Sequence, residues 1–156
     1  MAGDQFPGDE GDKTVVIIMT SGPSTPQRCA TPFYLGSLLA AMDAEVHIFF
    51  TMEGVRLTGE GRSRGLTAME GGKRIIEFIR DAKRAGVTLY VCQPALLRYK
   101  LGQSLGLIGE VDHVSRAGML ADLILSCDKV FSLLKVEPAA SWAAVRRVPL
   151  GYGLQS

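Results

Sequence analysis

An uninterrupted apolar run opens the globular part of the chain: Lys13-Thr14-Val15-Val16-Ile17-Ile18-Met19-Thr20. The residues from Val15 to Met19 are all apolar, so a strand formed by them has no face that suits water. Strands of this kind belong to parallel sheets covered on both faces, whereas half-exposed strands alternate polar and apolar residues. The run therefore predicts a buried strand of a parallel sheet.

Strand-like and helix-like segments alternate along the rest of the chain. The further strand-like segments are 45–51, 87–92, 110–114 (the weakest) and 129–133, and the helix-like segments are 32–42, 68–85, 94–101 and 115–127. Strands and helices in alternation form right-handed βαβ units, which place helices on both faces of one open sheet. The sequence predicts a single α/β domain, flavodoxin-like and three-layered (α/β/α), with about five parallel strands in the order 2-1-3-4-5.

The charge balance argues against a nucleic-acid-binding protein. The 156 residues include 17 Lys and Arg and 16 Asp and Glu, for a formal net charge of +1. A nucleic-acid-binding domain usually carries a strong basic excess. The chain also lacks an apolar stretch of about eighteen residues, which a membrane-spanning helix requires.

The domain is expected to occupy residues 13–156, with a C-terminal extension from about residue 134. Residues 1–12 are rich in Gly and Asp and are expected to form a disordered tail. The three cysteines are widely spaced, which fits neither a disulfide framework nor a zinc site. A reducing, cytoplasmic location is the simplest expectation.

Cys92 stands at the predicted carboxyl end of the third strand. Ligands of open α/β sheets bind at the carboxyl ends of the strands, near the point where the strand order reverses. In the order 2-1-3 that point falls between strands one and three, so the turn 21–29 is expected beside Cys92. Pro94 favours a helix start directly after it, and a helix start stabilises an anion and lowers the pKa of a thiol. We therefore predict that Cys92 is the catalytic residue.

Several residues are expected to surround this thiol. The predicted pocket consists of Ser21, Gly22, Gln93, Pro94 and His113. Cys29, in or just after the first loop, is a possible secondary thiol that forms a transient disulfide, or else a packed thiol. Cys127 is predicted to be structural.

The same residues also bear on other classes of site. The two histidines, His47 and His113, are far apart in the sequence, so no metal site is predicted. The hydroxyl-rich turn 20–25 resembles loops that hold a phosphate, which leaves open a flavin- or nucleotide-binding module in which Cys92 is incidental. Pro23 and Pro26 remove amide donors from that turn and weaken this interpretation. A non-catalytic oligomeric scaffold subunit is a further alternative.

Three segments resemble the DsrE/DsrF-like (TusD-like) sulfur-relay family. They are Val46-His47-Ile48-Phe49-Phe50-Thr51-Met52-Glu53-Gly54-Val55-Arg56-Leu57, Gly86-Val87-Thr88-Leu89-Tyr90-Val91-Cys92, and Ala117-Gly118-Met119-Leu120-Ala121-Asp122-Leu123-Ile124 followed by Asp128-Lys129-Val130-Phe131-Ser132. The first resembles the family's second strand and the turn after it. The second resembles the third strand, which ends in the sulfur-carrying cysteine, and the last resembles the final helix and strand. The resemblance spans about residues 13–133.

The resemblance implies a sulfurtransferase or sulfur carrier. By that analogy, Cys92 binds sulfane sulfur as a persulfide and passes it to a partner thiol, with no cofactor. The partners that the resemblance implies are a TusA-like or other sulfur-carrier protein and further copies of the same chain, in a trimer or hexamer. The proline-rich first loop, with its additional Cys29, and the segment after Ser132 are this chain's own features.

Overall fold

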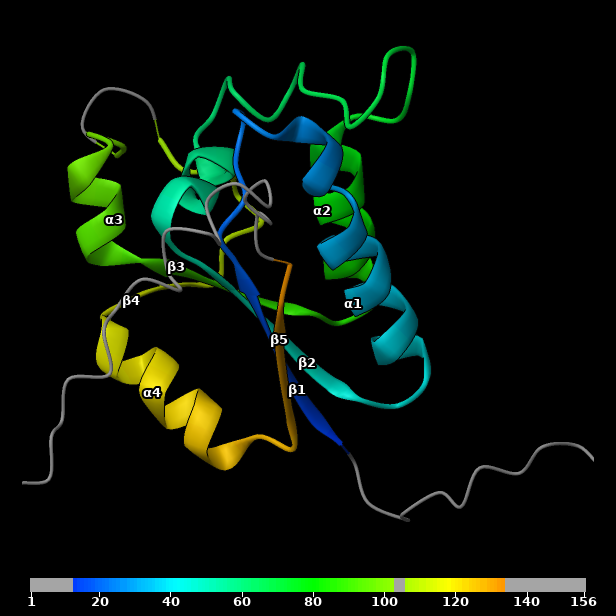
Figure 1. Ribbon diagram of the computed structural model, residues 1–156, viewed down its shortest axis with the longest axis vertical. Coiled ribbons are helices and arrows are strands. Elements are labelled where there is room, and N and C mark those ends of the chain that lie inside the picture. The colour runs from blue at the N-terminus through cyan, green and yellow to red at the C-terminus, as the bar shows by residue number, and fades with distance from the viewer. Residues whose placement is uncertain (1–12, 103–105, 134–156) are drawn as a thin grey trace, which may run out of the picture.

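The structure, a computed structural model, describes residues 13–102 and 106–133 as one parallel sheet with helices on both faces (Figure 1). The five strands are β1 (Thr14–Met19), β2 (Glu45–Phe50), β3 (Thr88–Cys92), β4 (His113–Ser115) and β5 (Lys129–Ser132). The helices are α1 (Thr31–Ala41), α2 (Ile75–Arg84), α3 (Gln93–Arg98) and α4 (Ala117–Ser126), with short 3-10 helices η1 (Pro26–Arg28) and η2 (Met52–Thr58). The expected tail 1–12 and the extension from residue 134 lie outside the described residues.

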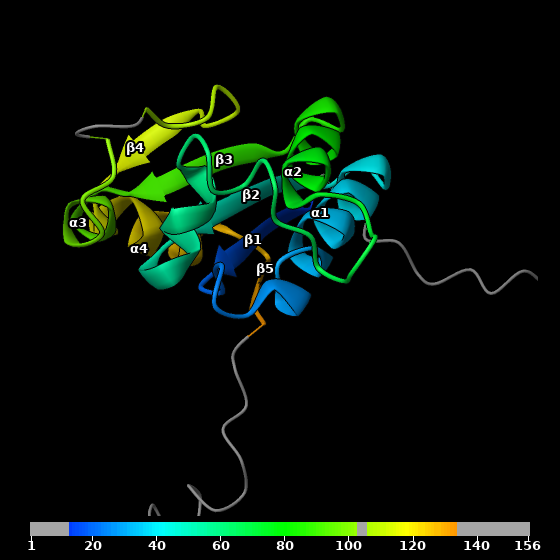
Figure 2. The same cartoon turned by 90° about the horizontal axis from the view of Figure 1, so that it is seen from above.

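The two faces of the sheet are covered by different helices. On one face, α1 packs closely, because a Cβ placed on Gly36 would lie 3.3 Å from a methyl group of Ile48 and 3.5 Å from one of Ile17. Helix α2 lies alongside α1 (Figure 2). Helix α4 connects β4 to β5, which lie at opposite edges of the sheet, so the chain crosses the sheet in the direction opposite to the earlier connections. Because crossover connections are right-handed, this reversal places α4 on the other face. The sequence-based prediction of an open parallel α/β sheet with helices on both faces is confirmed.

The strand order differs from the predicted 2-1-3-4-5. The observed order is β4-β3-β2-β1-β5, and all four pairings are parallel. In the predicted order β2 would lie at an edge, yet every residue of β2 after Glu45 is buried. Burying this apolar strand requires a neighbour on each side, whereas the short and more exposed β4 and β5 suit the edges.

Three helices begin at residues other than those that the sequence pattern predicts. Helix α2 begins at Ile75 rather than near residue 68, since the Arg74 backbone is extended and its N–H donates to the Glu77 carboxylate at 3.0 Å. Helix α3 begins at Gln93, which makes Cys92 itself the capping residue and puts Pro94 at the second helical position. Helix α4 is preceded by Arg116 rather than by Ser115. None of the helices in the two described ranges reaches the length and hydropathy of a membrane span.

Candidate functional site

Cys92 lies where three structural elements meet. It is the last residue of β3, it precedes the first residue of α3, and it pairs with Ser115 at the end of β4. Side chains alternate along a strand, so Cys92 shares a face with Tyr90, while the fully buried Leu89 and Val91 point to the other face. Cys92 is buried, with 8% of its surface exposed, and it stands at the carboxyl end of its strand.

Tyr90 and His113 lie next to Cys92 on this face. The pairing of Tyr90 with His113 is one strand step before that of Cys92 with Ser115, and the centres of the two rings are 4.9 Å apart. Burial is the main cause that raises the pKa of Tyr90, and the negative charges of Glu45 and Asp112 raise it further. Its phenol therefore stays protonated at neutral pH. The structure thus brings His113, Gln93 and Pro94 of the predicted pocket to Cys92. Tyr90 was missed, although the alternation along β3 could have identified it.

Ser21 and Gly22 lie elsewhere along the carboxyl edge of the sheet, because β2 separates β1 from β3. The turn after β1 packs instead against η2. A Cβ placed on Gly22 would lie 2.4 Å from the carbonyl oxygen of Glu53, and one placed on Gly54 would lie 2.1 Å from that of Met19. The expectation that this turn flanks Cys92 is therefore corrected, since it depended on strands one and three being neighbours.

The turn after β1 does form a cavity of about 440 Å³ together with η2 and the end of α3. Its walls are formed by Thr20, Ser21, Ser24, Thr25, Met52, Glu53 and Tyr99. Glu53 already serves as the anion of this loop, because its carboxylate accepts a hydrogen bond from the Ser24 amide at 2.8 Å and a short one from the Ser24 hydroxyl. The Thr25 amide donates to the Gly22 carbonyl oxygen at 2.9 Å. A phosphate would need these donors and would meet a carboxylate, so the geometry disfavours a phosphate-binding loop.

The other two cysteines have different surroundings. Cys29 is fully buried, and its thiol lies 3.3 Å from the Gly22 carbonyl oxygen. Burial, assisted by the negative charge of Glu53, raises the pKa of Cys29 to about 12. Cys127 is partly buried at the end of α4, with its thiol 3.4 Å from the Ile124 carbonyl oxygen. Within the described residues, the thiol of Cys92 makes no such hydrogen bond to a backbone carbonyl oxygen.

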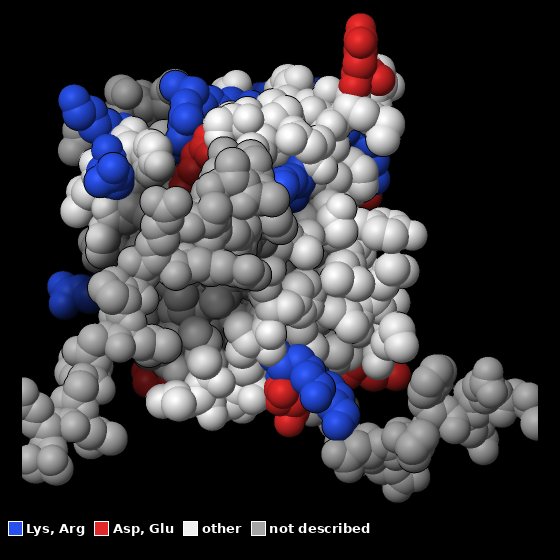
Figure 3. Space-filling model, in the orientation of Figure 1, with Lys and Arg blue, Asp and Glu red and all other residues white. Residues whose placement is uncertain are grey.

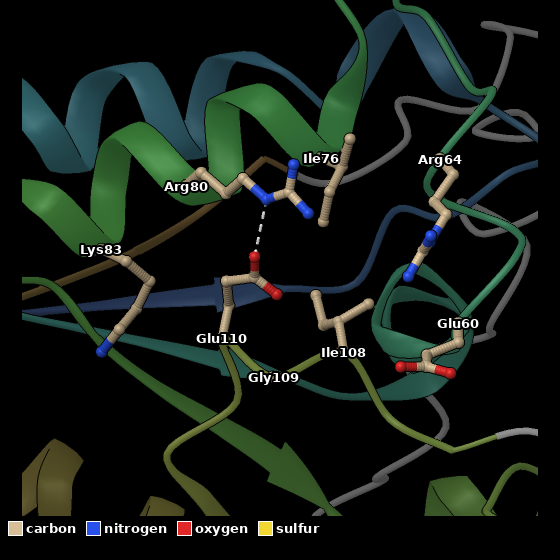
Figure 4. A pocket seen from close by; sticks show the side chains of 8 residues that line it. All are labelled: Glu60, Arg64, Ile76, Arg80, Lys83, Ile108, Gly109 and Glu110. Carbon is tan, nitrogen blue, oxygen red and sulfur yellow. Dashed lines mark hydrogen bonds and ion pairs between the residues drawn. The ribbon is translucent and has the colours of Figure 1, made fainter.

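A separate cavity of about 380 Å³ lies between α2 and the segment that precedes β4 (Figure 4). Its charges are largely balanced, because Arg80 donates to Glu110 at 2.7 Å and Lys83 lies 2.6 Å from Asp112. None of the site residues predicted from the sequence lines it. In the part of the chain that the structure describes, no group of three or more His, Cys, Asp or Glu side chains is arranged to hold a metal ion.

The fold and the rim cysteine define a parallel α/β protein with a thiol between a strand end and a helix start. Residues 13–133 match the model of the DsrE/DsrF-like family, and the chain belongs to this family, which is generally one of sulfur relay. The match includes β3 and Cys92 and ends just after β5.

Solved structures with the same fold come from several organisms. The ychN protein from E. coli is 20% identical with a TM-score of 0.66, and the alignment covers 78% of this chain and 99% of that one. MTH1491 from Methanobacterium thermoautotrophicum, a protein of unknown function, is 16% identical with a TM-score of 0.56, covering 79% of this chain and 100% of that one. At these identities the likeness shows the fold alone. No curated protein matches the chain in sequence.

Proposed function

We propose that this protein carries sulfane sulfur as a persulfide on Cys92 and passes it to the thiol of a partner protein. The observation that carries the proposal is the position of Cys92 at the carboxyl end of β3, directly before α3, where the residue is buried but keeps 8% of its surface exposed. Membership of the DsrE/DsrF-like family supports it. Burial raises the pKa of Cys29 to about 12, so this residue remains a protonated thiol at neutral pH, which is a poor nucleophile.

The chemistry requires two displacement steps and no change in overall oxidation state. In the first, the thiolate of Cys92 attacks the terminal sulfur of a donor persulfide, and the donor leaves as a thiolate. In the second, a partner thiolate attacks the terminal sulfur of Cys92–S–S⁻, which transfers that sulfur and restores the thiolate of Cys92. The cysteine is itself the carrier, so no cofactor takes part.

The proposal extends to partners and location through the family. A TusA-like or other sulfur-carrier protein would supply or accept the sulfur in the cytoplasm. Assembly as a homo-trimer or homo-hexamer belongs to the same proposal, and sedimentation of the purified protein measures it directly.

Mass spectrometry of the intact protein tests the central claim. The wild-type protein is incubated with a low-molecular-weight persulfide, desalted and weighed. We expect an adduct of one sulfur atom that is lost in Cys92→Ser and retained in Cys29→Ala and Cys127→Ala. An unmodified wild-type protein, or an adduct that persists in Cys92→Ser, would refute the assignment.

A further inference from the structure

We infer that the surface around Cys92 docks a protein partner whose own reactive thiol lies in an acidic segment. This inference rests on the proposed function, since it describes the partner that reaches the same thiol. It is carried by the charges and the exposed side chains of the two segments that border Cys92: residues 93–102, which follow it in the chain, and residues 113–121, which contain its strand partner Ser115.

These two segments carry only positive formal charges. They contain Arg98, Lys100 and Arg116, all exposed, and neither contains Asp or Glu. Arg116 directly follows the residue that pairs with Cys92, and Arg98 ends the short helix that Cys92 caps. In Figure 3, Lys and Arg side chains gather over the part of the molecule where Figure 1 shows α3. The formal charges of the segments that border Cys92 are therefore of one sign.

The positive charges near Cys92 are uncompensated, unlike those of α2. On α2, Arg84 pairs with Asp81, Arg80 with Glu110 and Lys83 with Asp112. Within the described residues, no ion pair engages Arg98, Lys100 or Arg116. Unpaired surface charges of one sign steer an oppositely charged partner and raise its rate of association.

The neighbouring carboxylates do not neutralise this surface. Asp112, which precedes His113, accepts hydrogen bonds from the Leu89 amide at 2.7 Å and from Lys83. Glu53 is engaged by Ser24 and by Arg56, whose Nη1 lies 3.5 Å away. Asp122 lies further along α4, beyond the segment that borders Cys92.

Exposed apolar side chains accompany two of these cations in the same segments. Leu97, which precedes Arg98 on α3, is 61% exposed, and Met119, three residues after Arg116 in the first turn of α4, is 43% exposed. A protein interface typically has an apolar centre with a polar rim. An acidic protein segment with apolar residues fits this combination better than a small inorganic anion, because an anion would leave the apolar side chains uncovered.

Thiol–disulfide exchange with two synthetic peptides tests the inference without a known partner. Both peptides have the same length and one cysteine activated as a pyridyl disulfide, which is flanked by Glu in one and by Lys in the other. The protein carries Cys127→Ala, so that the reaction reports Cys92, and pyridinethione release gives the rate. At low salt we expect the acidic peptide to react about tenfold faster than the basic one, and this ratio to fall towards one at high salt.

A matched pair of charge-reversal variants locates the effect. Arg98→Glu/Lys100→Glu/Arg116→Glu should abolish the preference for the acidic peptide. The control, Arg62→Glu/Arg64→Glu/Lys129→Glu, changes the net charge equally on segments that do not border Cys92 and should retain the preference.

Three outcomes would overturn the inference. They are equal rates for the two peptides at low salt, an equal loss of preference in the control variant, and no exchange with either peptide. Thiol–disulfide exchange requires a reactive thiol but no persulfide. The peptide rates can therefore be interpreted even if the mass experiment detects no sulfur adduct.

Discussion

The close approach of Gly54 to the end of β1 allows a quantitative test of the structure. In Gly54→Ala the new methyl group would lie 2.1 Å from the carbonyl oxygen of Met19 and 2.9 Å from its carbonyl carbon. An ordinary carbon–oxygen contact is about 3.3 Å or longer, so η2 and β1 would have to separate by about 1 Å. That oxygen also accepts the Thr51 amide at 3.0 Å, which ties it in place. Overpacking of this kind, against backbone atoms, lowers the free energy of unfolding by about 3 kcal/mol.

Urea denaturation followed by circular dichroism measures this cost. With a slope of about 2 kcal/mol per molar urea, a loss of about 3 kcal/mol lowers the unfolding midpoint by about 1.5 M. The matched control is Gly109→Ala, where no heavy atom lies within 4 Å of the added Cβ. Its free energy of unfolding should stay within about 0.5 kcal/mol of wild type. Equal midpoints for the two variants would refute the interlocking of η2 with β1.

Two further predictions follow from shifted pKa values. Burial, assisted by Glu53, raises the pKa of Cys29 from 9.0 to about 12, so its stabilising effect is complete below pH 9.0 and is lost as the pH rises towards 12. Between about pH 9 and pH 10.5, wild type should therefore lose more free energy of unfolding than Cys29→Ala, by up to about 1.4 kcal/mol per pH unit. For Asp112, burial acts to raise the pKa, but hydrogen bonds from the Leu89 amide and Lys83 outweigh it and lower the pKa below 3.8. Its contribution is present above that value and is lost in acid, so Asp112→Asn should flatten the decline in unfolding free energy below about pH 4.

Denaturation curves at a series of pH values check both predictions, because all other titrating groups are shared by each variant and wild type. Parallel alkaline curves for wild type and Cys29→Ala would contradict the burial of the Cys29 thiol. Parallel acid curves for wild type and Asp112→Asn would show that the bonds from Leu89 and Lys83 do not hold Asp112 in its charged form.

The sequence alone predicted which segments form strands and what kind of sheet they form. The apolar run from Val15 to Met19 and the similar runs later in the chain are local patterns, and a strand buried on both faces needs no more than such a pattern to be recognised. The same reasoning placed Cys92 at a strand end, next to a helix start set by Pro94. Helix starts were less predictable, because the start of α2 depends on Arg74 and Glu77 rather than on the apolar period.

Only the tertiary structure decided which strands are neighbours. Strand pairing joins segments that are distant in the sequence, and the apolar pattern of one strand does not specify which other strand pairs with it. The burial of β2 between β1 and β3 moved Ser21 and Gly22 away from Cys92, and the short β4 brought in His113 and Arg116. The contacts of Tyr90 with His113 and of Glu53 in η2 with the first loop follow from that order, because a side chain's neighbours across a sheet are set by strand pairing and register.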